Sequence, residues 1–128
     1  MEHYDPETAP DPAAWLGLDE GERIQVVENY HRDARVKLPK AARLPHATFH
    51  VIVENQLASN DEPAVRALSR LIKEGLSRHD AVHAIASIVA EEIYERSNEK
   101  DSPEIANIRY YASVERLTAK SWRDGASG

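Results

Sequence analysis

Hydrophobic residues recur every three or four positions along most of this chain, a period typical of α-helices that bury one face. Helical segments are predicted at residues 20–35, 45–58, 63–75, 78–97 and 103–122. No segment of useful length alternates hydrophobic and polar residues as a half-buried β-strand does. The pattern therefore predicts an all-α fold, a compact bundle of about five helices joined by short turns.

Caps and prolines mark the starts of these helices. Asp19 and Ser77 have side chains that can accept hydrogen bonds from the free N–H groups of a first helical turn. Pro45 and Pro63 suit a first turn, because proline lacks the N–H that would be unpaired there. The segment Asp101-Ser102-Pro103 combines both signals. We therefore expect the second helix to begin at Pro45 and the last at Pro103.

Composition divides the chain into three parts. Residues 1–18 contain three prolines among acidic residues, which predicts a flexible acidic N-terminal segment tethered near its end by Trp15. Residues 19–123 should form a single helical domain, and residues 124–128 a frayed tail. The length of 128 residues suits one domain with its own core.

Charge and cysteine content narrow the functional classes. A net charge of −6 argues against coating of nucleic acid, which needs a basic face to displace counterions from phosphates. Without cysteine, a transition metal would have to be held by His, Asp or Glu. There is no apolar stretch of transmembrane length and no secretory signal pattern at the start. We therefore expect a cytoplasmic protein with no membrane partner, and leave a homo-oligomer or a protein partner open.

Four of the six histidines form two pairs with a spacing of four residues, His46 with His50 and His79 with His83. Side chains four apart lie one above the other on a helix, so the two imidazoles of a pair can reach the same ion. His46 and His50 also share the apolar stripe of their helix, which should be buried. Two such pairs on packed helices predict a metal site, with zinc as the first expectation and iron or nickel as alternatives.

Two other residues near these pairs have more than one interpretation. Glu54 lies one turn beyond His50, where it is a candidate metal ligand, an acceptor of an imidazole N–H, or an exposed helix acid. His31 follows Tyr30 at the end of the first helix, where a histidine can complement the helix dipole. We assign His31 this role rather than ligation.

Asp80 follows His79 directly, so the second pair has the sequence H-D-x-x-H. This is similar to the H-E-x-x-H helix of zinc metallopeptidases, with Asp in place of Glu. In that helix the acid activates a metal-bound water as general base. Asp80 is therefore a candidate catalytic residue, although its carboxylate reaches one methylene less far than that of Glu.

The segment from Leu44 to Glu95 resembles a family of small bacterial helical proteins known as a domain of unknown function. The shared positions are His46, His50, Glu54, Gln56, His79, His83 and Glu91. Some relatives carry Glu at the position of Asp80 and an acid at the position of Ser87. The resemblance implies a metal site in a helical fold, with one ion here where a relative could hold two. It implies no particular activity.

Three functions are compatible with the sequence. The first is a metal-binding helical protein with a transition-metal site built from the two histidine pairs. The second is a non-metal protein-interaction module, in which the histidines belong to the core or its border and acidic amphipathic helices dock a partner. The third is a zinc-dependent hydrolase, which requires an open coordination position and Asp80 within reach of the bound water. The presence of both pairs favours the first.

Overall fold

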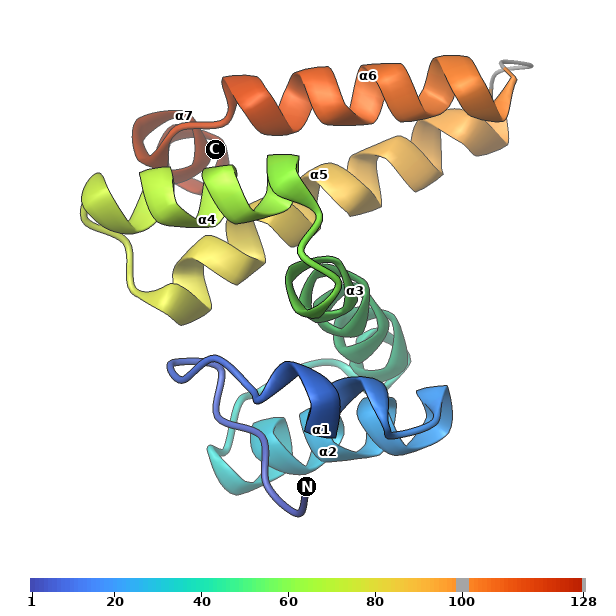
Figure 1. Ribbon diagram of the computed structural model, residues 1–128, viewed down its shortest axis with the longest axis vertical. Helices are drawn as coiled ribbons and strands as arrows, with labels where there is room; N and C mark the ends of the chain where they lie inside the picture. Colours follow the sequence, from blue (N-terminus) through green and yellow to red (C-terminus); the bar gives the residue numbers. More distant parts are fainter. Residues whose placement is uncertain (99–101, 128) are drawn as a thin grey trace.

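The computed structural model describes residues 1–98 and 102–127, and within these ranges all regular structure is α-helical (Figure 1). The helices are α1 (Pro12–Leu16), α2 (Glu20–Asp33), α3 (Lys40–Ala58), α4 (Glu62–Lys73), α5 (Arg78–Asn98), α6 (Pro103–Arg116) and α7 (Ala119–Ser127). The all-α prediction is confirmed, and the described helices exceed the five predicted by two. None of the helices in the described ranges has the length and apolar character needed to cross a membrane.

Helix α3 contributes side chains to two hydrophobic cores. Figure 1 shows it between α1 and α2 on one side and α4 to α7 on the other. The smaller core contains Ala47 and Val51 of α3 together with side chains from the N-terminal segment, α1 and α2. The larger core contains Val53 of α3 and side chains of α4, α5, α6 and α7. Residues on different faces of α3 therefore connect the two halves of the molecule.

Helix α5 is central in the larger core, as its largely apolar sequence predicts. It packs against α3, α4, α6 and α7. Val82 and Ile85 are fully buried, whereas Ile93, nearer the end of the helix, is exposed. The apolar side chains of the first turns of α5 are therefore buried against the neighbouring helices, whereas its later turns, up to Ile93, are more exposed.

Side-chain caps fix the starts of several helices where the sequence predicted them. Asp19 and Glu22 form a reciprocal capping box at α2. The Ser77 hydroxyl accepts a hydrogen bond from the backbone N–H of Asp80 at 3.1 Å, and that of Ser102 accepts one from Ile105 at 3.2 Å. Asp101, the other predicted capping residue at this last helix, lies outside the described residues.

The predicted start of the second helix at Pro45 is wrong, because α3 begins at Lys40 and contains Pro45 in its interior. Proline cannot donate the hydrogen bond that the carbonyl of Ala41 would normally accept. Both Pro45 and Ala41 are exposed, so water can reach that carbonyl. The helix thereby gains an additional turn before the histidines.

The predicted last helix, 103–122, is divided into α6 and α7. Leu117 adopts an extended conformation with φ −65° and ψ 131°. The guanidinium of Arg70 donates hydrogen bonds to the carbonyls of Val114 and Leu117, which satisfies the end of α6. Thr118 and Ser121 then cap each other at the start of α7. Helix α7 extends through residues predicted as a frayed tail, and Gly128 lies outside the described residues.

The N-terminal segment 1–18, predicted to be flexible and tethered near its end by Trp15, packs against the domain. The side chains of Tyr4 and Trp15 are buried in the smaller core. Trp15 lies in the short helix α1, capped by Asp11, and its indole N–H donates to the side chain of Asn55 at 2.9 Å. Two buried aromatic residues thus hold a segment whose prolines and acids suggested disorder.

Replacement of Ile85 with Ala should lower the free energy of unfolding by about 2–5 kcal/mol, because it removes a fully buried side chain from the larger core. Replacement of Ile93 with Ala is the matched control on the same helix. Ile93 is 49% exposed, and its loss should change stability by less than about 0.5 kcal/mol. Denaturant unfolding followed by circular dichroism measures both. Equal losses would contradict the central placement of α5.

Candidate metal centre

Five histidine side chains from three helices converge near the start of α5. They are His31 of α2, His46 and His50 of α3, and His79 and His83 of α5. The ring centroids of neighbouring members lie between 4.3 and 5.3 Å apart. We call these five residues the histidine cluster. The two predicted pairs therefore face each other across the α3–α5 contact, as a shared site requires.

A subset of the histidine cluster has the geometry of a metal-ion site. Each member offers one ring nitrogen, and these nitrogens all lie within 4.8 Å of one another. The members are His31, His50, His79 and His83. Nitrogens that all coordinate one tetrahedral zinc ion at about 2.0–2.1 Å are about 3.3–3.5 Å apart, so modest side-chain adjustments would bring these four onto one ion.

His31 belongs to this set, whereas the sequence analysis assigned it to the helix dipole. His46, a predicted ligand, is not one of the four, although its Nε2 atom lies 3.1 Å from Nε2 of His31. The sequence held a signal for His31. Ile24, Val27 and His31 follow one another at intervals of three and four residues, which places His31 on the buried stripe of α2.

Three imidazole nitrogens of the histidine cluster are buried without a hydrogen-bond partner in the described part of the chain. They are the Nε2 atoms of His50, His79 and His83. Buried polar atoms of this kind are normally paired, because removal from water without a partner costs free energy. A metal ion bound between the rings would accept a lone pair from each. The donor set therefore fits a metal ion.

Burial keeps the histidine cluster uncharged at neutral pH. Loss of hydration, followed by repulsion from the other histidines, lowers the pKa of His50 to about 2 and that of His83 to about 3. Burial and the neighbouring His46 lower the pKa of His31 to about 4. The pKa values of His46 and His79 are also lowered, in both cases mainly by burial. Neutral imidazole is the form that donates a lone pair to a metal ion.

The hydrogen bonds of His31 indicate which of its nitrogens can bind an ion. Its Nδ1 atom lies 2.9 Å from the backbone carbonyl oxygen of Val27, so Nδ1 must carry the proton. The Nε2 atom then has a free lone pair, and it receives a hydrogen bond from Nε2–H of His46. An ion bound to His31 would displace this contact with His46.

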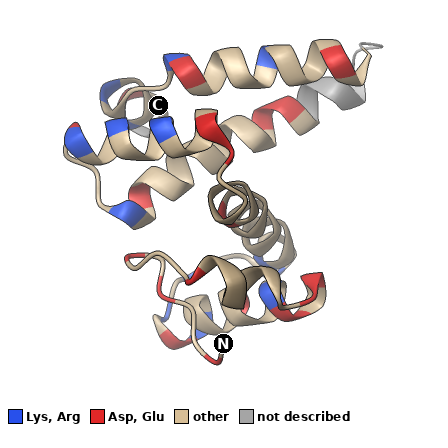
Figure 2. Cartoon of the chain, in the orientation of Figure 1, with Lys and Arg blue, Asp and Glu red and all other residues tan. Residues whose placement is uncertain are grey.

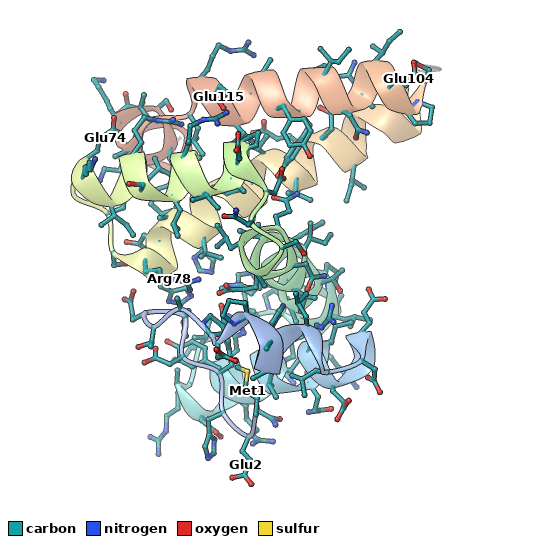
Figure 3. All side chains as sticks on the ribbon, in the orientation of Figure 1. Met1, Glu2, Glu74, Arg78, Glu104 and Glu115 are labelled. Atoms are coloured by element: carbon teal, nitrogen blue, oxygen red, sulfur yellow. The ribbon has the colours of Figure 1, made fainter. Side chains whose placement is uncertain are left out.

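Glu54 lies beside the histidine cluster but is engaged elsewhere. Its carboxylate is fully buried and pairs with the guanidinium of Arg78 through two hydrogen bonds of 2.8 and 2.9 Å. The hydroxyl of Tyr4 donates a third hydrogen bond to it. Figure 3 shows Arg78 at the start of α5, next to the N-terminal segment. The structure thus brings Glu54 to Arg78 and Tyr4, and not into the set of four ligand nitrogens.

Two further positions singled out in the sequence contribute no ligand to this set. Asp80 is exposed, and it does not join the four residues whose ligand atoms gather. Ser87 donates its hydroxyl to the backbone carbonyl of Ala84 at 2.6 Å. Helix α3 carries no Lys, Arg, Asp or Glu between Arg43 and Glu54, so most of this helix is tan in Figure 2. The gathered ligand atoms are therefore all imidazole nitrogens, with no carboxylate oxygen among them.

A surface cavity of about 300 Å³ adjoins the histidine cluster at His31. Its other lining residues are Gln25, Glu28, Asn29, Arg32, Val36, Leu38 and Arg43. Most of these side chains are polar and come from α2 and the segment that leads into α3. The surface next to His31 is therefore hollowed and mostly polar.

No protein-family model, curated protein or solved structure matches this chain. The histidine cluster and its surroundings are therefore the observations from which a function can be proposed.

The metal-free protein should lose stability as the pH falls from about 6.5 toward 5. The unfolded chain takes up protons on its histidines near pH 6.5, whereas the native pKa values of His31, His50 and His83 are lower. The unfolded state therefore binds more protons in this range, and stability rises with pH. Each histidine that is protonated only on unfolding adds a slope of up to about 1.4 kcal/mol per pH unit.

Denaturant unfolding in the presence of a chelator, measured at half-unit pH steps, gives this slope. His83→Gln should reduce it, because the variant has one histidine fewer to protonate on unfolding. A free energy of unfolding that is constant between pH 6.5 and 5 would contradict burial of neutral imidazoles.

Proposed function

We propose that this protein binds one divalent transition-metal ion in the histidine cluster, with His31, His50, His79 and His83 as ligands. Zinc is the first candidate, and iron or nickel are alternatives. The observation that carries the proposal is the set of buried Nε2 atoms of His50, His79 and His83, which lack a partner in the described part of the chain and belong to rings whose centroids lie 4.3 to 5.3 Å apart. Binding of one ion would satisfy all three.

The chemistry of the donors selects the class of ion. Calcium and magnesium prefer oxygen ligands, which this site does not offer in the gathered set. Neutral imidazole nitrogen suits zinc, iron, nickel and copper. Zinc accepts four ligands in a tetrahedron without a preference imposed by its d electrons, so a set of four histidines fits it best.

His46 is assigned a supporting role in this proposal. In the metal-free protein its Nε2–H donates a hydrogen bond to the lone pair on Nε2 of His31. Its ring also packs against His50 and His83, at centroid distances of 5.2 and 5.0 Å. Binding of an ion to Nε2 of His31 would break its hydrogen bond with His46. The ion would then have four ligands, and His46 would not be one of them.

The bound ion would join α2, α3 and α5, and so the two hydrophobic cores that meet at α3. Because the unfolded chain does not hold these ligands together, binding would stabilise the native state. We therefore favour a structural or sensing role. Four protein ligands would fill the coordination shell of zinc and leave no position for a bound water. Asp80, the predicted general base, is exposed and does not belong to the ligand set.

The interaction-module alternative explains the site less well. In a module without metal, the unpartnered nitrogens of His50, His79 and His83 would remain a cost of folding. The paired segments also carry the resemblance to the small bacterial helical family, and we propose membership of that family as well.

Metal content tests the proposal directly. Protein purified without an affinity tag and reconstituted with zinc should contain about one equivalent after dialysis, because four ligands form one tetrahedral site. His83→Asn should lose this zinc at the same dialysis conditions. His3→Asn is the control, because it removes an exposed histidine outside the cluster. Wild-type protein with less than about a tenth of an equivalent of zinc, iron and nickel would overturn the proposal.

The choice between His31 and His46 gives a second test. His31→Asn should weaken zinc binding by at least about tenfold, because it removes a ligand. His46→Asn should retain one equivalent, because it removes no ligand and frees the Nε2 lone pair of His31. Isothermal titration of the metal-free variants with zinc measures both. Loss of binding in His46→Asn with retention in His31→Asn would restore the assignment made from the two sequence pairs.

A further inference from the structure

Tyr4 of the N-terminal segment contacts the histidine cluster, although it belongs to none of the three helices that carry the histidines. The side chain is buried, and its hydroxyl oxygen lies 3.3 Å from Nδ1 of His50. Its ring packs edge-on against that of His50, with centroids 6.0 Å apart. His50 is itself fully buried and provides one of the unpartnered Nε2 atoms. Tyr4 thus meets the face of His50 that points away from the proposed ion.

The protons of these groups can be placed by elimination. Glu54 pairs with Arg78 through both oxygens and accepts a hydrogen bond from the hydroxyl of Tyr4. A carboxylate can only accept here, so the Tyr4 hydroxyl is the donor in this contact and its proton points to Glu54. The phenol has a single proton, so its oxygen can only accept from His50. Nδ1 of His50 is therefore the protonated nitrogen, and Nε2 keeps its lone pair for the ion.

The same N-terminal segment is fastened to both helices that carry the histidine pairs. Tyr4 bonds to Glu54 of α3, whereas the carbonyl of Pro6 accepts a hydrogen bond of 2.9 Å from Arg78 of α5. The carboxylate of Glu7 accepts one of 2.8 Å from the backbone N–H of His79. Residues 4–7 therefore span the contact between α3 and α5 on the side of His50.

We propose that Tyr4 is a positioning residue of the metal centre, which transmits the fixed orientation of Glu54 and Arg78 to His50 and holds Nε2 toward the ion. This inference rests on the proposed metal site. Hydrogen bonds of this kind fix both the tautomer and the ring orientation of a ligating histidine, and their loss typically costs about 10- to 100-fold in metal affinity. The N-terminal segment is accordingly part of the centre.

Tyr4→Phe tests this role, because it removes the hydroxyl and keeps the ring. The matched control is Tyr30→Phe. The ring of Tyr30 also packs edge-on against cluster members, His31 at 5.4 Å and His79 at 5.6 Å, but no hydrogen bond of its hydroxyl is found in the described part of the chain. Zinc affinity is measured by competition with a chromophoric chelator. The visible spectrum of the cobalt-substituted protein reports the ligand geometry.

Tyr4→Phe should weaken zinc binding by about 10- to 100-fold and shift the cobalt absorption bands, while one ion is still bound. Tyr30→Phe should change neither. The proposal is overturned if Tyr4→Phe lowers only the melting temperature of the metal-free protein and leaves zinc affinity and the cobalt spectrum unchanged. It is also overturned if both variants lose affinity equally, because the rings would then act by packing alone.

The wild-type titration separates this inference from the proposed function. Zinc binding by wild-type protein together with an unaffected Tyr4→Phe variant would reject the positioning role and keep the metal site. Absence of binding in the wild type would reject both.

Discussion

The unpartnered imidazole nitrogens of His50, His79 and His83 are the constraint on which the site depends. A buried polar atom that lacks a partner costs about 1–3 kcal/mol, and here three such atoms gather on facing turns of α3 and α5. Burial also lowers the pKa values of these three histidines, so the rings are uncharged and able to offer a lone pair to an ion. A bound metal ion would turn this cost into stabilisation.

The scaffold places these nitrogens with both apolar and ionic contacts. The two hydrophobic cores lie on different sides of α3, so this helix is fixed on both faces and its histidines have little freedom to move. The buried pair of Glu54 and Arg78 then joins α3 to the first turn of α5. Breaking a pair of this kind leaves an uncompensated charge, so it strongly restrains the relative position of the two helices.

Local signals in the sequence were sufficient to predict most helices and both histidine pairs, because spacing and capping act within a few residues. Asp19, Ser77 and Ser102 cap helices as predicted. The features that were missed depend on contacts far apart in the chain. His31 reaches the other histidines because α2 packs on α3. Tyr4 is buried where its hydroxyl donates a hydrogen bond to Glu54, fifty residues away in the chain. The spacing of Ile24, Val27 and His31 marks a buried face of α2 but does not identify the helix that covers it, and Tyr4 belongs to no periodic pattern.

X-ray absorption spectroscopy of the zinc-loaded protein is the most direct measurement of the central claim. The account predicts a shell of about four nitrogen neighbours at about 2.0–2.1 Å, with the outer-shell scattering that imidazole rings produce. The same spectrum should lose one imidazole contribution in His31→Asn and keep all of them in His46→Asn. A shell dominated by oxygen, without imidazole scattering, would contradict a metal centre built from the histidine cluster.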